Sequence, residues 1–351
     1  MRYRDAGVDI ARAEALKRRI GELVRSTWLA GLVPLSGGFA GVTGLPAGGG
    51  SAGEPGGPLL LAASMDGVGT KLHLAIATGR VSDAATDLVY HGANDLLVHG
   101  ARPVAFLDYA AQARLDPAVV LAAVEGIARG CVEVGAVLLG GETAEMPDTY
   151  LPGTLDLAGC MLGVVAEGRL LDGSAVRPGD VLLGLAAAGL HTNGYSLARA
   201  VLARSGLGLG DRLPGGAGET LGEALLAPHR WYGPALAAAL EERRVHALAH
   251  VTGGGIAGNL VRVLPPGCRA QVRAASWPRP VVFRWLLSVG EVPEEDARSA
   301  FNLGVGMVVV CAAEQADRLT EGLERSGERV FRLGSIHSGE RGVEWVESPE
   351  T

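Results

Sequence analysis

Short apolar segments alternate with stretches of helical periodicity along most of the chain, and one polar connection interrupts this alternation. The connection spans residues 170–178, and a new strand-like segment begins soon after it. A chain of 351 residues is too long for a single ordinary hydrophobic core, so two domains are expected. Alternating strands and helices are typical of α/β and α+β folds. We therefore predict two α/β (α+β) domains, residues 1–168 and residues 169–351.

Apolar periodicity and capping residues locate the individual elements. For the first half they predict strands at 59–63, 103–109, 136–139 and 156–165, and helices at 10–28 (N-cap Asp9), at 82–99 (N-cap Ser82) and from Asp116-Pro117 onward. For the second half they predict strands at 181–187, 245–250 and 303–312, and helices near 196–204 and 229–241. The glycine-rich stretch 44–58 predicts a mobile surface loop.

The charge balance and the cysteines argue against several classes of protein. The 38 acidic and 31 basic side chains give a net charge of −7 and form no basic stripe, which argues against nucleic-acid binding. The four cysteines form no C-x-x-C pair, which predicts reduced thiols in a cytosolic protein. No apolar run is long enough to cross a membrane, and the first residues do not resemble a signal peptide. We therefore expect a soluble, cytoplasmic protein that binds neither nucleic acid nor membranes.

The segment 64–71 (SMDGVGTK) contains the residue types of a phosphate-binding loop in an unusual order. It does not follow the P-loop order, which ends in Gly-Lys-Ser/Thr. Asp66 also carries a negative charge where a bare phosphate cradle would avoid one. A Mg²⁺ ion between the carboxylate and the phosphate removes this conflict. The other candidate nucleotide ligands of the segment are Gly67, Gly69, Thr70 and Lys71.

The predicted helix 82–99 contains a stripe of polar side chains. Asp87, His91 and Asn94 fall at positions i, i+4 and i+7 and share one face, with Asp95 on its flank. Such a stripe is consistent with a solvated outer face. It is equally consistent with a set of Mg²⁺ and nucleotide ligands, because Asp66 lies only a short distance upstream.

A third acidic residue, Glu142, follows a predicted strand in the segment Gly-Gly-Glu-Thr-Ala-Glu-Met-Pro (140–147). An exposed acid in a tight turn and a metal ligand explain this pattern equally well. Asp108, near the end of another strand, is a weaker candidate, since a lone acid at such a position is more often structural. Together with Asp66 and the acids of the helix, Glu142 completes the oxygen ligands that Mg²⁺ needs between phosphates.

Two segments of the second half place small residues where a strand leads into a helix. They are Ala-Gly-Leu-His-Thr-Asn-Gly-Tyr-Ser (188–196) and Thr-Gly-Gly-Gly-Ile-Ala-Gly-Asn (252–259), and Arg262 follows the second by three residues. Free N–H groups at a helix N-terminus bind anions, but glycine equally serves close helix–strand packing. Two such segments in one domain favour anion binding. His191 is balanced between a structural and a catalytic role, and His250 is better explained as structural.

Several well-known chemistries have no motif here. The sequence contains no nucleophile elbow, no H-E-x-x-H, no G-x-G-x-x-G after the first strand and no Cys/His pair. Covalent and zinc catalysis are therefore not expected. The combined pattern predicts an acidic, metal-dependent nucleotide site in one domain that faces an anion site in the other.

The order of these motifs resembles the phosphoribosylformylglycinamidine cyclo-ligase family, the aminoimidazole ribonucleotide synthetases. The shorter pattern Asp95-x-x-x-x-Gly-Ala-x-Pro resembles only a wider superfamily of ATP-using enzymes. The motifs that narrow it are Tyr3-x-x-Ala-Gly-Val-Asp-Ile10, Gly37-Gly-Phe39, Asp66-Gly-Val-Gly-Thr-Lys71, Asn94-Asp-Leu-x-x-x-Gly-Ala-x-Pro103, Phe106-Leu-Asp-Tyr109, Gly140-Gly-Glu-Thr-Ala-Glu-Met-Pro147, His191-Thr-Asn-Gly-Tyr-Ser-Leu-Ala-Arg199, His250-Val-Thr-Gly-Gly-Gly255 with Asn259 and Arg262, and Phe301-Asn-x-Gly-Val-Gly-Met307.

The resemblance implies a fold, a reaction and a set of ligands. The fold is a homodimer in which the N-terminal sheets of two subunits pair into a barrel, each followed by a C-terminal α/β domain. The reaction uses ATP and Mg²⁺ to close the imidazole ring of aminoimidazole ribonucleotide, from formylglycinamidine ribonucleotide, in purine biosynthesis. The need for K⁺ stays open.

The same resemblance assigns roles to individual residues. The expected ligands of the metal and of the nucleotide phosphates are Asp66, Asp95 and Glu142, assisted by Lys71, Asn94 and Asp87. The residues expected to bind the ribose phosphate of the substrate are Gly253, Gly254, Gly255, Asn259 and Arg262. His191 and Asn193 are expected near the reacting formamide, with His191 as proton carrier.

The sequence departs from the family pattern at several positions. Ala187-Ala188 replaces a pair of serines, residues 88–93 read Leu-Val-Tyr-His-Gly-Ala instead of a sequence ending in Ala-Met-Cys-Val, and residues 47–57 are an insertion. None of these changes removes a predicted metal ligand. The alternatives are another ATP-using superfamily member, such as thiamine-monophosphate kinase, and a non-catalytic nucleotide-binding regulator. Selenophosphate synthetase is less suitable, because the first cysteine is Cys131.

Overall fold

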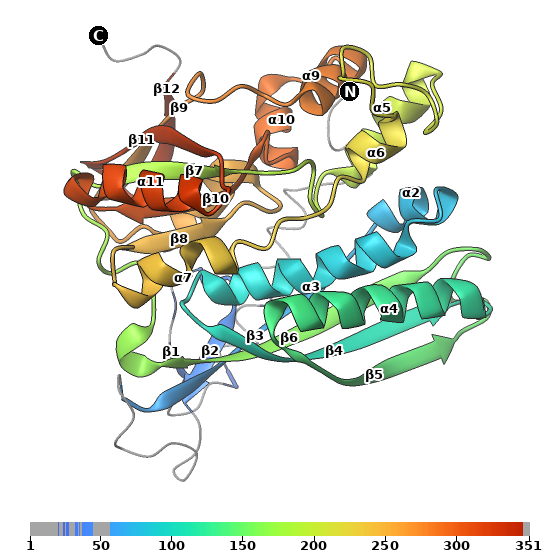
Figure 1. The fold of residues 1–351 in the computed structure, drawn as a ribbon, viewed down its shortest axis with the longest axis horizontal. Helices are drawn as coiled ribbons and strands as arrows, with labels where there is room; N and C mark the ends of the chain where they lie inside the picture. The colour runs from blue at the N-terminus through green and yellow to red at the C-terminus, as the bar shows by residue number, and fades with distance from the viewer. Residues whose placement is uncertain are drawn as a thin grey trace.

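The computed structural model describes residues 37–44 and 57–346 and a few positions between Ile20 and Leu35. Most of the predicted helix 10–28, the motif that begins at Tyr3 and most of the predicted loop 44–58 lie outside the described residues. The described residues form two six-stranded sheets with helices packed on them (Figure 1).

The first sheet has the strand order β1-β2-β3-β6-β4-β5, and all neighbours are antiparallel except β4 and β5. Its strands are β1 (Leu32–Val33), β2 (Gly41–Gly44), β3 (Leu59–Gly67), β4 (Arg102–Gln112), β5 (Val137–Glu145) and β6 (Asp156–Ala166). The connected helices are α2 (Lys71–Ala77), α3 (Val81–Leu97) and α4 (Pro117–Val134).

Helices α3 and α4 lie on the same face of this sheet (Figure 1). The side chain of Asp116 caps α4 as predicted, by accepting hydrogen bonds from the N–H groups of Ala118 and Val119. Gly126 lets the two helices approach closely, since a Cβ atom there would lie 2.0 Å from the carbonyl oxygen of Ser82. This contact fixes α3 between α4 and the rest of the molecule.

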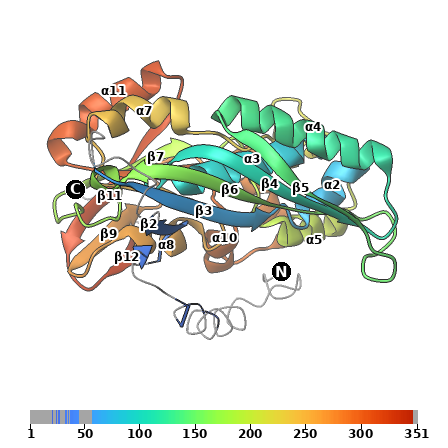
Figure 2. The ribbon, with the colours of Figure 1, turned by 90° about the horizontal axis from the view of Figure 1, so that it is seen from below.

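No described helix covers the opposite face of the first sheet (Figure 2), and apolar side chains lie on that face. Along β6, buried residues alternate with half-buried ones such as Cys160, Leu162 and Val164. Met65 on the neighbouring strand β3 and Leu139 on the edge strand β5 are 69% and 64% exposed. An antiparallel sheet in water usually has one polar face, so this second apolar face is unusual.

The second sheet has the order β12-β9-β11-β7-β10-β8, in which only β12 and β9 are parallel. Its strands are β7 (Val181–Ala186), β8 (Ala247–His250), β9 (Cys268–Arg273), β10 (Val305–Cys311), β11 (Val330–Ser338) and β12 (Gly342–Val346). Every residue of β10 is buried, which explains its uninterrupted apolar sequence.

Helices surround the second sheet, and α7 and α11 lie together on one side of it (Figures 1 and 2). The helices are α5 (Tyr195–Ser205), α6 (Leu221–Leu225), α7 (Gly233–Glu241), α8 (Gly255–Leu260), α9 (Val281–Gly290), α10 (Glu294–Ala300) and α11 (Ala316–Arg325). Single-turn 3-10 helices are η2 (Glu167–Arg169), η3 (Val261–Val263) and η4 (Ala313–Gln315). The predicted division between residues 168 and 169 falls within η2 and stays a prediction.

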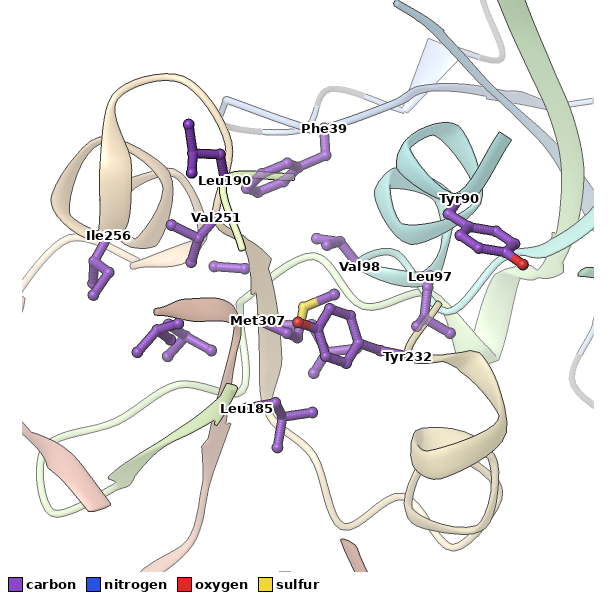
Figure 3. Packing of buried hydrophobic residues seen from close by; sticks show 14 of the residues in the cluster. Phe39, Tyr90, Leu97, Val98, Leu185, Leu190, Tyr232, Val251, Ile256 and Met307 are labelled. Carbon is purple, nitrogen blue, oxygen red and sulfur yellow. The ribbon is translucent and has the colours of Figure 1, made fainter. Parts of the chain in front are cut away.

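One hydrophobic core runs through both halves. Figure 3 shows Tyr232 between Met307 of β10 and Leu97 at the end of α3. The hydroxyl group of Tyr232 donates a hydrogen bond to the carbonyl oxygen of Ala186 at 2.9 Å, so this large side chain is buried without an unpaired polar atom. The two sheets are therefore joined by packed side chains as well as by the chain.

Four predicted boundaries are wrong. Helix α3 begins at Val81 with Arg80 as N-cap, and Ser82 makes no cap. Helix α7 begins at Gly233, and residues 229–232 are irregular. Strand β3 continues through Asp66, and strand β5 through Glu145, so two segments predicted as loops are ends of long strands. Pairing with β6 and β4 extends these strands beyond their apolar residues.

Candidate active site

A cavity of about 680 Å³ lies where the first sheet, α3 and the loops of the second half meet. Its polar lining includes two carboxylates, a histidine and an arginine from distant parts of the chain. These lining residues are Asp66, His91, Asp95 and Arg262, together with Ser64, Phe39, Asn193, Thr252 and Gly253. The structure thus brings the predicted metal ligands Asp66 and Asp95 to the same cavity as part of the predicted anion site.

Strand β3 and helix α3 supply the two carboxylates. Asp95 is buried, and it accepts hydrogen bonds from the Ser64 hydroxyl group at 3.0 Å and from His250 Nδ1 at 2.8 Å. The Asp66 side chain is 37% exposed, and its Oδ2 lies 3.2 Å from Nε2 of His91. The same Nε2 lies 3.8 Å from Asp95, so the His91 ring bridges the two acids.

The polar stripe of α3 is buried, and its interpretation as a solvated outer face is wrong. Asp87, His91, Asn94 and Asp95 are at most 6% exposed. Buried charges need partners, and each of these side chains has one. The stripe therefore serves the site and the contact with the second half.

The charges around His91 favour its protonated form. Burial lowers its pKa, but the carboxylates of Asp66 and Asp95 outweigh burial and raise the pKa to about 9. In the metal-free protein, His91 therefore carries the positive charge that compensates the two acids.

This compensation predicts a pH-dependent stability. Because the pKa of His91 rises from about 6.5 in the unfolded chain to about 9 in the folded protein, the stabilisation is complete below the first value and is lost as the pH rises through the second. The melting temperature of the protein without divalent ions should therefore fall by several degrees across this interval. Thermal denaturation of His91→Gln, which cannot be charged, should lack this fall. An equal fall in both proteins would contradict the assignment.

Lys71, Asp87 and Asn94 do not line the cavity. Lys71 is 1% exposed, pairs with Asp87, and donates a hydrogen bond to the carbonyl oxygen of His191 at 2.7 Å. Burial lowers the pKa of Lys71, but the Asp87 carboxylate and Tyr195 outweigh it, so the ammonium group stays charged. The amide of Asn94 donates to the carbonyl oxygen of Arg230 at 2.8 Å. These side chains join α3 and α2 to the second half.

The remaining residues of the 64–71 segment surround the start of α2. Gly67 ends β3, and Gly69 has a φ angle of 67°, which glycine adopts without strain. The hydroxyl group of Thr70 lies 3.2 Å from that of Ser196, in the second half. The segment is therefore a turn that contacts the second half on one side and presents Asp66 to the cavity on the other.

Glu142 lies away from the other two acids within this chain. Across the sheet Asp66 pairs with Gly159, Gly159 with Asp108, and Asp108 with Gly141, the neighbour of Glu142. Three strand spacings of about 4.8 Å separate β3 from β5, or roughly 14 Å. Glu142 is exposed on the edge strand, and Asp108 lies in the middle of β4.

The predicted anion loop forms a tight turn into α8. Gly254 and Gly255 have φ angles of 96° and 63°, and a Cβ atom at Gly255 would lie 1.8 Å from the carbonyl oxygen of Arg298. Asn259 holds the turn by donating to the carbonyl oxygens of Gly253 and Gly255 at 3.3 and 2.8 Å. Only Gly253 of the three glycines lines the cavity. The glycines thus serve close packing, which also positions this lining residue.

Arg262 connects this turn to the glycine pair near the N-terminus. Its guanidinium group lies 3.8 Å from the centre of the Phe39 ring and donates to the carbonyl oxygens of Gly37 and Gly38 at 2.6 and 2.5 Å. A third N–H group reaches Oδ1 of Asn259 at 3.2 Å. Arginine has five N–H donors, so the side chain is fixed in place and retains donors for a ligand in the cavity.

Of the two residues predicted near the reacting group, the structure places one at the cavity. Asn193 lines it, whereas His191 is 1% exposed, absent from the lining and stacked on His229 at 3.9 Å between ring centres. His191 has a φ angle of 60°, uncommon outside glycine. The sequence interpretation missed Ser64 and His229. Ser64 could have been found, because it lies two residues before Asp66 on the same face of a strand.

Comparison with known proteins identifies the family of the chain. The model for the N-terminal domain of AIR synthase related proteins matches residues 53–165, and the model for their C-terminal domain matches residues 177–347. A phosphoribosylformylglycinamidine cyclo-ligase of Sorangium cellulosum is 47% identical over 339 residues, which cover 96% of this chain and 95% of that protein. The chain belongs to the phosphoribosylformylglycinamidine cyclo-ligase family. The resemblance inferred from its motifs is confirmed.

Solved structures outside this family share its fold at low identity. A thiamine-monophosphate kinase from Stenotrophomonas maltophilia matches with a TM-score of 0.62 at 21% identity and covers 93% of this chain and 95% of its own. T. maritima PurL complexed with FGAR matches with a TM-score of 0.56 at 18% identity and covers 92% of this chain and 46% of its own. These likenesses establish the two-domain fold of the family but not an activity. Among the described residues, no helix is long and apolar enough to span a membrane.

Proposed function

We propose that the protein closes the imidazole ring of 5-aminoimidazole ribonucleotide from formylglycinamidine ribonucleotide, in purine (IMP) biosynthesis, and converts ATP to ADP and phosphate. The observation that carries this proposal is the cavity in which Asp66, Asp95 and Arg262 meet, in a chain of the cyclo-ligase family. Two carboxylates suit a metal–nucleotide complex, and an arginine with free donors suits a phosphate group. We expect the enzyme to act in the cytoplasm, where its four unpaired cysteines stay reduced.

The carboxylates at the cavity fit Mg²⁺. Asp66 and Asp95 offer hard oxygen atoms on either side of one histidine nitrogen, and Mg²⁺ prefers one or two carboxylates with the phosphates of the substrate. Mg²⁺ bound there would neutralise charge on the nucleotide phosphates. Asp87 does not fit this role within the chain, because it is paired with Lys71. Glu142, three strands away, would reach a nucleotide only at another part of the site.

The side chains of the second half fit the ribonucleotide. Arg262 would hold the ribose phosphate, together with the N–H groups around Gly253, while Asn193 lies next to Gly253 in the cavity lining. The Phe39 ring packs against one face of the guanidinium group. This arrangement leaves the formyl end of the substrate to face Asp66 and Asp95.

The reaction needs alignment more than a strong base. The formyl amide oxygen attacks the γ-phosphorus of ATP, and ADP leaves. The amidine nitrogen then attacks the formyl carbon and loses a proton, and phosphate departs with the formyl oxygen. Fixed donors and charges that hold the two substrates in line supply most of the acceleration in such transfers. His91 and Asn193 line the cavity and are candidates for holding the amide in this alignment.

We also propose that the active enzyme is a homodimer that pairs its first sheets. The uncovered face of that sheet carries half-buried and exposed apolar side chains, among them Met65, Leu139 and Leu162. Burying such a face against a second copy removes it from water. The edge strand β5, with Glu142, would then lie near the partner.

A coupled assay tests the proposed function. Purified enzyme with ATP and Mg²⁺ should release phosphate only when formylglycinamidine ribonucleotide is present, in equal amounts with the aminoimidazole product. Phosphate transfer to an acceptor without free phosphate would support the kinase alternative, and nucleotide binding without turnover of the substrate would contradict the proposal. Dependence on K⁺ is read from the same assay in sodium and potassium buffers.

A further inference from the structure

Four histidine rings lie together beneath the cavity. His91, His191, His229 and His250 come from α3, from the loop after β7, from the segment before α7 and from the end of β8, and none is more than 6% exposed. The ring centres of His229 and His250 are 5.2 Å apart, and those of His191 and His229 are 3.9 Å apart. Buried polar rings need partners, so the hydrogen bonds of this cluster decide its chemistry.

The partners of Nδ1 fix the protons of two rings. The Nδ1 atom of His229 lies 2.9 Å from the carbonyl oxygen of Arg230, which can only accept, so this nitrogen carries the proton. Nδ1 of His250 lies 2.8 Å from the Asp95 carboxylate, which likewise accepts when it is ionised. In neutral rings, both Nε2 atoms then carry lone pairs.

These two Nε2 atoms face each other at 3.2 Å. Two lone pairs at that distance repel, so a proton or a metal ion must lie between them. A tetrahedral Zn²⁺ ion with bonds of about 2.05 Å separates its ligands by roughly 3.3 Å, which matches the observed distance.

His191 supplies the third nitrogen. Neither of its ring nitrogens has a hydrogen-bond partner among the described residues, although both are buried. One nitrogen from each of His191, His229 and His250 lies within 4.8 Å of the others. No hydrogen bond opposes rotation of the His191 ring, so its nitrogen is free to turn toward the gap between the other two.

We propose that His191, His229 and His250 form a buried binding site for a divalent transition metal ion, with Zn²⁺ as the best fit. Three imidazole nitrogens suit Zn²⁺ and Co²⁺ and do not suit Mg²⁺, which prefers oxygen. Asp95 and the carbonyl group of Arg230 orient two of the rings by accepting hydrogen bonds from Nδ1, which leaves Nε2 free to bind the ion. Its ligands are nitrogen atoms and not the oxygen atoms that line the cavity, and Asp95 contacts it only through His250. The metal site does not depend on the proposed reaction.

A protonated Asp95 is the competing arrangement. Burial raises the pKa of this carboxyl group, and a neutral Asp95 would donate to His250, which would then donate through Nε2 to His229. That chain of hydrogen bonds needs no ion. It leaves both nitrogens of His191 without a partner, however, whereas a metal ion would bind one nitrogen of each of the three rings.

Binding of Co²⁺ alone tests the proposal. Enzyme freed of transition metal ions and kept in excess Mg²⁺, without nucleotide or ribonucleotide, is titrated with Co²⁺. Binding is followed by visible absorption and calorimetry. We expect one equivalent to bind with the absorption bands of a nitrogen-ligated ion, and Zn²⁺ to displace it. His229→Gln should weaken binding at least about 100-fold by removing one ligand, whereas His73→Gln, at an exposed histidine of α2 outside the cluster, should bind as the wild type does.

Three results would contradict the proposed metal site. They are the absence of stoichiometric binding to the wild type, equal binding by wild type and His229→Gln, and loss of binding in His91→Gln with retention in His229→Gln. The last result would place the ion among His91, Asp95 and His250, which also lie close together. If His229→Gln does not fold, anomalous scattering from wild-type crystals soaked in Co²⁺ decides the question, because the peak must lie between the three rings.

Discussion

Asp95→Asn should lower ATP-dependent formation of the aminoimidazole product by at least about 100-fold, because the substitution removes one of the two charges that would hold the metal–nucleotide complex. The amide is nearly the same size as the carboxylate, and its oxygen can still accept a hydrogen bond from His250. Asp95 is buried between Ser64 and His250, so the substitution should change charge much more than shape. Product formation and phosphate release, measured together across a range of Mg²⁺ concentrations, give the effect.

Asp83→Asn is the matched control. Asp83 lies on the same helix, and its carboxylate pairs with Arg80 and Arg129 away from the cavity. The control should retain turnover within about twofold, and both variants should show the circular dichroism of the wild type. Activity of Asp95→Asn within a few-fold of the wild type would refute a role of Asp95 at the metal.

Lys71→Met should destabilise the protein by about 3–5 kcal/mol, because it leaves Asp87 as an unpaired charge in the interior. Both side chains of this ion pair are 1% exposed. The substitution also removes the donor to the carbonyl oxygen of His191. Urea denaturation of the variant and the wild type measures the difference in free energy of unfolding.

Two further variants separate charge from packing. Lys71→Met/Asp87→Asn removes the buried charge and keeps an acceptor for the N–H group of His229, which Asp87 now binds at 2.7 Å, so it should be more stable than Lys71→Met alone. Arg325→Met breaks an exposed pair with Glu321 at 3.8 Å and should leave the urea midpoint nearly unchanged. Wild-type stability of Lys71→Met would mean that the pair contributes little to the fold.

The sequence predicted the elements with strong apolar periodicity better than their ends. The cap at Asp116 was predictable because its mechanism is local. The extension of β3 through Asp66 was not, since the glycines and the acid of that segment look like a loop. Its strand conformation comes from pairing with Gly159 of β6, a partner almost a hundred residues later in the chain.

For the candidate site, too, the sequence predicted local relations and missed contacts between distant segments. The sequence predicted Asp66 and Asp95 as ligands of one metal ion, and both line the same cavity, because the spacing from a strand end to a helix face is short. It gave no means of seeing that Lys71 faces Asp87 and the second half. Nor could spacing reveal that His229 joins His191 and His250, since these residues come from three separate segments of the second half. Contacts between distant segments are the part that local patterns do not contain.

The hydrogen bonds of α2 and α3 toward the second half bear on how the protein unfolds. Many of them end on main-chain atoms, including the carbonyl oxygens of His191 and Arg230 and the N–H groups of His229 and Tyr232. Each sheet thus depends on the other to satisfy buried groups. We therefore expect the two halves to unfold together. Either half expressed alone would expose polar groups that are buried between the halves, among them Lys71 and Asp87.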